Sequence, residues 1–155
     1  MVGVDGSANS MEALVWSAHE ARLRGAVLEV IHVRPLRHEV LELFATDVLN
    51  SETAVLDSAV SRAETLESEI TVIGRLCDPP AAEVLIDASE GAELLVVGKR
   101  GIGGFKGLAS GSVASECVRR GRCPVVIVQL EGQEVSSVGT FGSPDSTEAS
   151  RVPQD

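Results

Sequence analysis

The segment from Gly98 to Ser112 holds the residues best suited to chemistry in this sequence. It reads GKRGIGGFKGLASGS and combines glycines with three cations, Lys99, Arg100 and Lys106. Glycine allows positive φ and close backbone approach, so successive N–H groups can converge on an anion. Ser112 begins a predicted helix, whose free N–H groups and positive dipole end favour phosphate. The segment therefore predicts a phosphate-binding loop, and the alternative is a flexible connection between two elements.

Other known phosphate and nucleophile motifs do not match this loop. A P-loop requires GxxxxGK[ST], and no such string occurs in the chain. The dinucleotide pattern GxGxxG begins at Gly101, but Lys106 stands where its third glycine belongs. The hydrolase pattern GxSxG is approached over 107–111, with its serine one place late. The loop therefore predicts phosphate binding without predicting any of these three chemistries.

Charge and composition limit the partners. The 155 residues include 23 acidic and 13 basic side chains, which gives a net charge of −10. So acidic a surface repels polyanions, and one Trp, three Phe and no Tyr provide few stacking platforms for bases. We therefore exclude a nucleic-acid polymer as a partner. Residues 131–155 are rich in Ser, Gly, Glu and Pro without a hydrophobic period, which predicts a disordered acidic tail after a domain over 1–130.

The sequence shows no targeting segment and no metal-binding pattern. The N-terminus lacks the basic and apolar regions of a secretory signal, and no apolar run approaches the ~20 residues of a membrane span. The odd number of cysteines favours free thiols in a reducing cytoplasm: Cys77, Cys117 and Cys123. The histidines show no ligand spacing with these thiols, so we interpret them as structural or surface residues: His19, His32 and His38.

Apolar runs and helical patterns alternate along residues 1–130. Short runs rich in β-branched residues predict strands over 2–4, 27–33, 70–73, 94–97 and 124–128. Apolar residues at helical spacing predict helices over 8–24, within 46–68, from an N-cap at Asp78 to a stop at Gly91, and over 112–120. Gly25 is predicted to end the first helix.

This alternation predicts an α/β fold with a single open, doubly wound, five-stranded parallel sheet and helices on both faces. In such sheets, ligands bind beyond the carboxyl ends of the strands where the winding direction reverses. The two segments in question follow the first and fourth strands. They begin at Asp5 and at Gly98, so the unusual residues fall where a ligand is expected.

Several of these motifs together resemble the universal stress protein family. Its nucleotide-binding members carry G-x2-G-x9-G-[ST] after the fourth strand, and this chain has Gly98, Gly101, Gly111 and Ser112 at those intervals. The opening VGVDGS, the strand end at His32 and Val33, and CPVVIV over 123–128 are also similar. The resemblance extends over about residues 1–130 and implies a fold like that of the adenine nucleotide alpha hydrolases.

The resemblance also implies a nucleotide site. It implies that Gly98 and Gly101 let the loop approach ribose and phosphates, while the backbone of residues 111–113 holds the phosphate chain. Asp5 would accept from a ribose hydroxyl or lie near a phosphate-bound Mg²⁺, and the backbone of Val33 would bind adenine. No catalytic residue and no metal held by the protein itself are predicted. The residues expected around the nucleotide are Gly3, Val4, Asp5, Val33, Val97, Gly98, Arg100, Gly101, Gly111, Ser112 and Val113.

Three positions depart from the family pattern. Fewer residues than usual precede Asp5 in the first strand, so we expect an internal start or a truncated chain. Lys99 stands where a small hydroxyl residue is common, which should strengthen phosphate attraction. Ala114 replaces a frequent hydroxyl residue, which should remove one phosphate contact.

The function implied by the resemblance is that of a cytoplasmic, ATP-binding switch or sensor in the stress response, with AMP or a cyclic nucleotide as alternative ligands. A homodimer through the fifth strand is also implied, and it would cover the apolar edge that this strand exposes if it lies at the side of the sheet. Two other functions stay open: a nucleotide-free dimeric interaction protein and a slow ATP hydrolase. The hydrolase is less favoured, because no general base can be named beyond Asp5.

Overall fold

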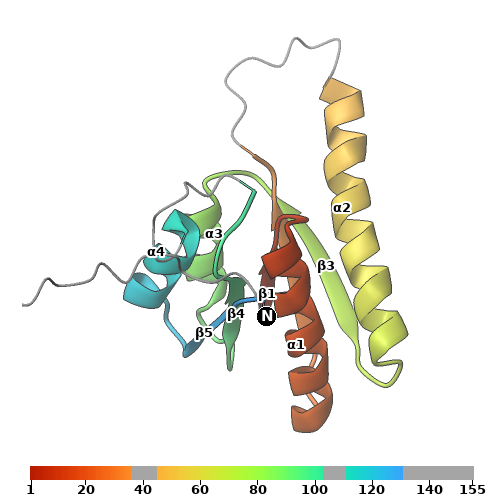
Figure 1. The fold of residues 1–155 in the computed structure, drawn as a ribbon, viewed down its shortest axis with the longest axis vertical. Helices are drawn as coiled ribbons and strands as arrows, with labels where there is room; N and C mark the ends of the chain where they lie inside the picture. Colours follow the sequence, from red (N-terminus) through yellow and green to blue (C-terminus); the bar gives the residue numbers. More distant parts are fainter. Residues whose placement is uncertain (36–44, 103–110, 131–155) are drawn as a thin grey trace, which may run out of the picture.

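The computed structural model describes residues 1–35, 45–102 and 111–130 (Figure 1). Strands and helices alternate along the chain as the sequence predicts. The strands are β1 (Val2–Val4), β2 (Leu28–Val33), β3 (Val72–Cys77), β4 (Leu95–Gly98) and β5 (Val125–Val128). The helices are α1 (Ala8–Arg24), α2 (Ala45–Leu66), α3 (Ala81–Ala88) and α4 (Ser112–Arg120).

All strands lie parallel in one sheet with the order β3-β2-β1-β4-β5. The short strand β1 is central, since it pairs with β2 from Val2↔Val30 to Val4↔His32 and with β4 up to Gly3↔Val97. The winding direction reverses between β1 and β4, which are neighbours in space but not in sequence. The predicted fold class is therefore confirmed, and the expected ligand position lies at the ends of these two strands.

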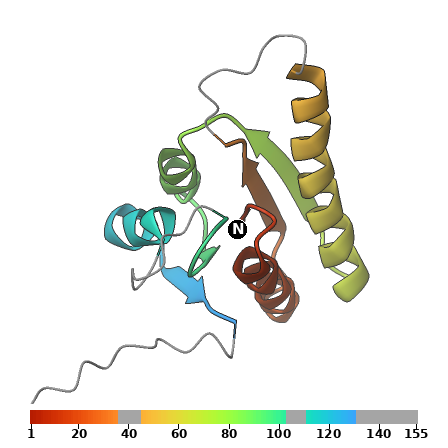
Figure 2. The same ribbon diagram turned by 45° about the horizontal axis from the view of Figure 1, so that its top comes forward.

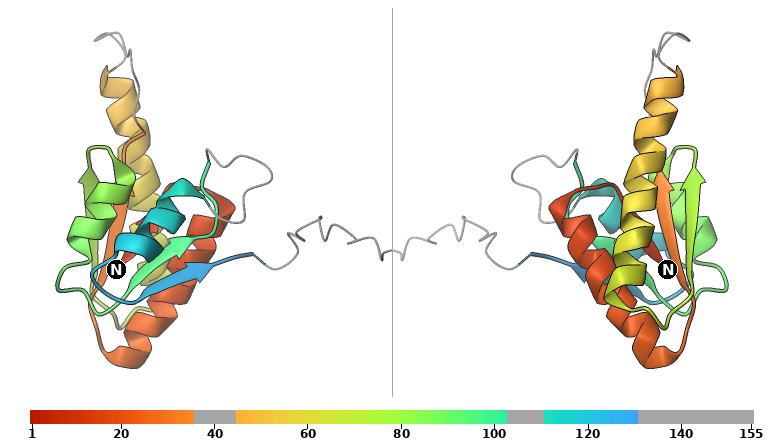
Figure 3. Two further views of the ribbon diagram at one scale, coloured as in Figure 1. Left: turned by 90° about the vertical axis from the view of Figure 1, so that its left-hand side faces the viewer. Right: turned by 90° about the vertical axis from the view of Figure 1, so that its right-hand side faces the viewer.

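Two helices cover each face of the sheet. Figure 3 shows α3 and α4 in front of the strands in its left view and α1 and α2 in front in its right view, and Figure 2 separates the same two pairs. Along β2, Val30 packs with Leu14 and Leu56 on the face of α1 and α2. The next residue, Ile31, packs with Leu85 on the opposite face. Because both sides of β2 are covered, apolar residues occur on both of its faces and its sequence is largely apolar.

The first helix begins and ends at the predicted residues. Its N-cap is Ser7, whose hydroxyl accepts from the backbone N–H of Ser10 at 3.3 Å. Gly25 follows the helix with φ of 63°, and its N–H reaches the carbonyls of Ala21 and Arg22. A left-handed residue at this point is most favourable as glycine, so the predicted stop is confirmed.

The third strand and the third helix differ from their predicted bounds. The strand lies at Val72–Cys77 rather than 70–73, because it pairs residue by residue with β2 up to Val33↔Cys77. Strand β3 lies at the edge of the sheet and exposes its middle residues. The apolar pattern that predicts a strand therefore does not continue through it. The N-cap of α3 is Pro80 and not Asp78, whose carboxylate instead pairs with Arg34.

Some predictions fall on residues outside this description. The proposed tail over 131–155, His38, and the loop residues Phe105 and Lys106 are among them. Within the described ranges, no helix combines the length and apolar character needed to cross a membrane. All three cysteines are free thiols, and burial raises the pKa of Cys117 to about 11.

Candidate functional site

A cavity of about 390 Å³ opens at the carboxyl ends of β1 and β4. Its volume is within the range of small-molecule sites. All eleven residues predicted around a nucleotide line it: Gly3, Val4, Asp5, Val33, Val97, Gly98, Arg100, Gly101, Gly111, Ser112 and Val113. The structure thus brings together segments that are nearly 100 residues apart in sequence. Five further lining residues were not predicted: Ser10, Ile31, Ala81, Leu85 and Ala114.

Asp5 lies where the turn after β1 meets the loop after β4. One carboxylate oxygen accepts from the N–H of Ser7 at 3.0 Å and the other from the N–H of Ile102 at 2.9 Å. Burial alone would raise the pKa of Asp5, but hydrogen bonds from Ser7, Ile102 and Ser10 outweigh it and lower the pKa. Asp5 is therefore ionised at neutral pH and connects the two segments of the site.

Two glycines of the loop have a steric role that spacing alone does not reveal. A Cβ at Gly98 would lie 2.8 Å from the backbone of Asn9 and Ser10 at the start of α1. A Cβ at Gly101 would clash with a carboxylate oxygen of Asp5. These glycines let the loop pack on the β1–α1 turn itself, in addition to any approach to a ligand.

The second half of the motif begins helix α4 at the cavity. Gly111 is its N-cap, supplies no side chain to the N–H groups of the first turn, and donates its own N–H to the carbonyl of Lys99 at 2.8 Å. Ser112, Val113 and Ala114 of that first turn line the cavity. The cavity thus faces the positive end of a nine-residue helix, where backbone donors suit an anion.

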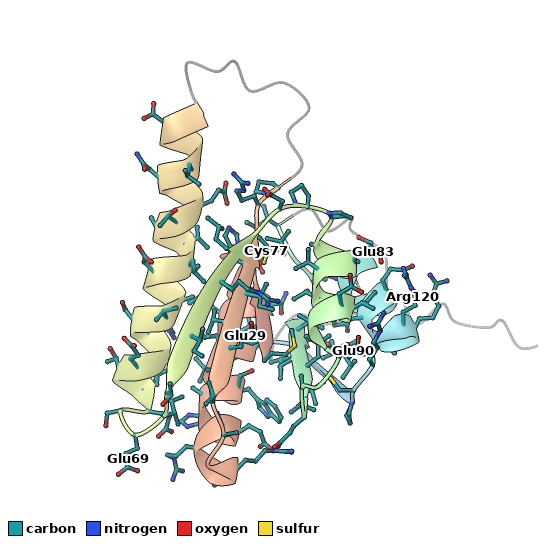
Figure 4. All side chains as sticks on the ribbon, turned by 180° about the vertical axis from the view of Figure 1, so that it is seen from behind. Glu29, Glu69, Cys77, Glu83, Glu90 and Arg120 are labelled. Atoms are coloured by element: carbon teal, nitrogen blue, oxygen red, sulfur yellow. The ribbon has the colours of Figure 1, made fainter. Side chains whose placement is uncertain are left out.

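The cations of the chain are divided between the cavity and the surface. Arg100 lines the cavity, whereas the Lys99 ammonium donates to the side chain of Gln129 at 2.6 Å and Lys99 is not a lining residue. The structure thus shows no contact of Lys99 with the cavity, and its contribution to phosphate attraction stays a prediction. Arg120 joins α4 to α3 through Glu83 at 2.6 Å, as Figure 4 shows. Arg122 likewise pairs with Glu90, which follows the end of α3.

Much of the remaining cavity lining is apolar. It is formed by Ile31 and Val33 of β2, Leu85 of α3 and Val97 of β4, with Ala81 beside them. Ile31, Leu85 and Val97 also belong to the core on this face of the sheet. Sequence reasoning assigned Leu85 to the apolar stripe of its helix, and only the position of α3 over β2 shows that it borders a cavity as well.

The cavity therefore combines apolar side chains with groups that can bind an anion. Apolar side chains suit a flat, weakly polar ring, while a helix N-terminus with Arg100 suits a phosphate. Across residues 1–35, 45–102 and 111–130, no group of three His, Cys, Asp or Glu side chains is placed to hold a metal ion. The lining resembles a site for an amphipathic anion.

Comparisons with known proteins identify chains similar to this one. The universal stress protein Rv2624c of Mycobacterium tuberculosis is 32% identical over 139 residues, which cover 88% of this chain and 50% of that protein. The chain thus spans about half the length of the curated relatives it matches. A universal stress protein crystallised in complex with cAMP is 28% identical, with a TM-score of 0.65, over 82% of this chain and 93% of that one.

A more distant structure shares the fold. UspA from Lactobacillus plantarum superposes with a TM-score of 0.70 at 18% identity, over 82% of this chain and 95% of that one. The model of the "Universal stress protein family" matches residues 1–129, which include every strand and helix described above. By its fold, its glycine motif and this match, the chain belongs to the universal stress protein family.

Proposed function

We propose that this protein binds an adenine nucleotide in the cavity between β1 and β4 and acts as a nucleotide-dependent switch or sensor in the stress response. The observation that supports it is the pairing of an apolar wall with the N-terminus of α4 in one cavity. The universal stress protein crystallised with cAMP supports the adenine class of ligand. ATP is the ligand we propose first, with AMP and cyclic nucleotides as the alternatives.

In this proposal different lining residues contact the adenine ring, the ribose and the phosphates. The adenine ring packs between Ile31, Val33 and Leu85 and bonds to the backbone of Val33. The phosphates bind the backbone of residues 111–113 and the guanidinium of Arg100. The ribose hydroxyls donate to the Asp5 carboxylate, whose ionised form is a strong acceptor. Mg²⁺ would be held through the phosphates, where it offsets repulsion between them and Asp5.

We further propose a homodimer through β5 in the cytoplasm. Among the strands of the described sheet, β5 is an edge strand whose only neighbour is β4. Ile127 on it and Val118 on the adjacent α4 are both exposed. An exposed apolar edge favours pairing with another strand, and a second copy of β5 is the partner proposed. Three free thiols agree with a reducing compartment.

Isothermal titration with ATP, ADP, AMP and cAMP, with and without Mg²⁺, tests the nucleotide proposal. We expect saturable binding by the wild type and at least about tenfold weaker binding by Gly111→Leu. Its Cβ would lie 3.4 Å from the carbonyl oxygen of Lys99, so a bulky side chain would displace the loop or the start of α4, both of which line the cavity. Gly25→Asn is the matched control, since asparagine tolerates the left-handed conformation and nothing lies within 4 Å of a Cβ there.

Each alternative function predicts a different outcome. A wild type that binds no nucleotide would favour the interaction protein. Phosphate release well above the background of Gly111→Leu would favour the hydrolase. Sedimentation velocity tests the dimer, which Ile127→Lys should dissociate, and a wild-type monomer at micromolar concentration would contradict it.

A further inference from the structure

His32 and Glu52 form a buried polar pair beside the cavity. His32 is 2% exposed and lies in β2, while Glu52 is 7% exposed and lies on α2. The imidazole Nε2 is 2.8 Å from a carboxylate oxygen of Glu52, and Nδ1 is 2.8 Å from the backbone oxygen of Val4. One buried ring therefore connects β2, α2 and the end of β1, whereas the sequence alone suggested only a structural or surface histidine.

The two contacts define which ring nitrogen carries a proton. A backbone carbonyl can only accept a hydrogen bond, so Nδ1 of His32 must be the donor to Val4. The other ring nitrogen, Nε2, then faces the carboxylate of Glu52 at 2.8 Å. A histidine oriented through one nitrogen presents its other nitrogen in a defined direction, so Glu52 aims the Nδ1–H at Val4.

The bond to Val4 controls the peptide group that precedes Asp5. This peptide is planar. Its carbonyl accepts from His32 at 2.8 Å, and its N–H, which belongs to Asp5, donates to Ser10 Oγ at 3.2 Å. The pairing of β1 with β4 ends at Gly3↔Val97, so the sheet does not hold this peptide on that side. Hydrogen bonds at both edges of a plane restrict its rotation, and so restrict the direction in which the Asp5 side chain leaves the backbone.

Helix α2 also contacts the turn that follows. A Cβ at Gly6 would lie 3.6 Å from a methyl group of Val55, one turn after Glu52. The same helix thus orients the imidazole and packs against the turn between β1 and α1. Asp5 lies between these contacts, with its carboxylate on the amides of Ser7 and Ile102.

We infer that His32 is a positioning residue of the nucleotide site, which holds the peptide between Val4 and Asp5 so that the carboxylate meets the ribose in a fixed geometry. Glu52 orients the imidazole and thereby couples α2 to the site. The inference rests on the proposed function for its ligand, but its structural effect on Asp5 does not depend on any ligand.

Two substitutions separate the contacts of His32. His32→Asn places an amide nitrogen near the position of Nδ1 and keeps a donor for Val4. His32→Gln reaches toward Glu52 and leaves Val4 without that donor. We expect His32→Asn to bind ATP within about threefold of the wild type, and His32→Gln to bind about tenfold more weakly, as one misplaced hydrogen bond implies. A merely structural role predicts that affinity follows stability in both variants.

Ser17→Ala is the matched control for stability. Ser17 is buried in α1 and donates to the carbonyl of Ala13 at 2.7 Å, and it does not line the cavity. This variant should lose stability without losing affinity for ATP. Equal ATP affinity in His32→Gln and His32→Asn would overturn the inference.

Nuclear magnetic resonance provides a second readout that needs no nucleotide. The imidazole ¹⁵N spectrum of the wild type should show a proton on Nδ1, and a proton absent from it would overturn the inference. The amide signals of Asp5 and Ile102 should shift in His32→Gln and stay near their wild-type positions in His32→Asn. If both variants leave these amide signals unchanged, the inference fails.

If His32→Gln does not fold, the His32→Asn spectra and titration decide. A wild type that binds no nucleotide but shows these shifts would contradict the proposed function and leave the positioning of Asp5 intact.

Discussion

The turn after β1 and the loop after β4 meet at the same cavity, yet different interactions hold them in place. The turn is organised by side chains: Ser7, Ser10 and His32 bond to the backbone around Asp5, and Asp5 bonds to it in return. The loop instead depends on close backbone packing, because Gly98 and Gly101 have no side chain and so let its backbone approach α1 and Asp5. Polar contacts can be weakened one at a time, whereas a steric requirement fails with a single added methyl group.

The largest effect is expected from Gly98→Ala. The added Cβ would lie 2.8 Å from backbone atoms of Asn9 and Ser10, which cannot move without shifting α1. We expect a loss of about 2–3 kcal/mol in the free energy of unfolding, measured by urea denaturation. Gly3→Ala is the matched control, because the atoms nearest to its Cβ would belong to the flexible side chain of Leu85, at 2.9 Å. An equal loss in both variants would contradict the steric distinction.

A smaller effect is expected from Asp5→Asn. The amide keeps one acceptor and directs its NH₂ group at an N–H donor, so we expect a loss of about 1–2 kcal/mol at pH 7. Because the pKa of Asp5 is lowered in the folded chain, its contribution is complete above the unfolded value and is lost as pH falls through the folded value. The difference in unfolding free energy between wild type and variant should persist at pH 5 and shrink below about pH 4. A difference that does not change with pH would contradict the charge-based account of this turn.

Arg100→Gln tests whether the loop contributes charge as well as shape. We expect ATP affinity to fall about tenfold, while the affinity for adenosine stays the same, because one charge-assisted contact to phosphate is lost. Lys99→Gln is the control within the same loop, since its ammonium bonds to Gln129 and it does not line the cavity. The two variants are compared by titration with ATP. Equal losses of affinity would show that the positive charge of the loop attracts the phosphates over a distance, and that direct contact with Arg100 adds little.

The smallest effect is expected from Arg120→Ala, outside both segments. Its ion pair with Glu83 is exposed to solvent, and such pairs are weak and screened by salt. We expect little change in the midpoint of thermal unfolding and none in ATP affinity. A clear loss of ATP affinity would mean that the ion pair between α3 and α4 also affects the cavity. The turn after β1 and the loop after β4 would then not be the only segments that hold the site in place.

Local patterns were sufficient to predict the elements wherever burial and periodicity coincide. Helix α1 has its apolar residues at helical spacing and a left-handed glycine after its end, so both bounds were predictable. Strand β3 was misplaced because it lies at an edge and exposes Gly74 and Arg75 in its middle. Its bounds depend on pairing with β2, and no local pattern records which strand will be its neighbour.

The residues of the site also divide into those that local patterns predicted and those that depend on tertiary packing. The spacing of Gly98, Gly101, Gly111 and Ser112 identified the loop, and the expected doubly wound sheet placed a ligand near both this loop and Asp5. Ser10, Leu85 and His32 were missed as contributors to the site, because serine at a helix start, leucine in an apolar stripe and a single histidine in a strand are common structural residues.

The sequence by itself determined which segments form strands and helices in this protein, that the sheet is parallel and doubly wound, and which two loops carry the unusual residues. These properties follow from local periodicity, turn chemistry and the short range of backbone hydrogen bonding. Only the tertiary structure decided that Gly98 packs against the backbone of α1, that the Lys99 ammonium bonds to Gln129, and that His32 connects Glu52 to the peptide before Asp5. Each of these contacts joins residues from different elements, so its geometry exists only once the sheet and its helices have packed together.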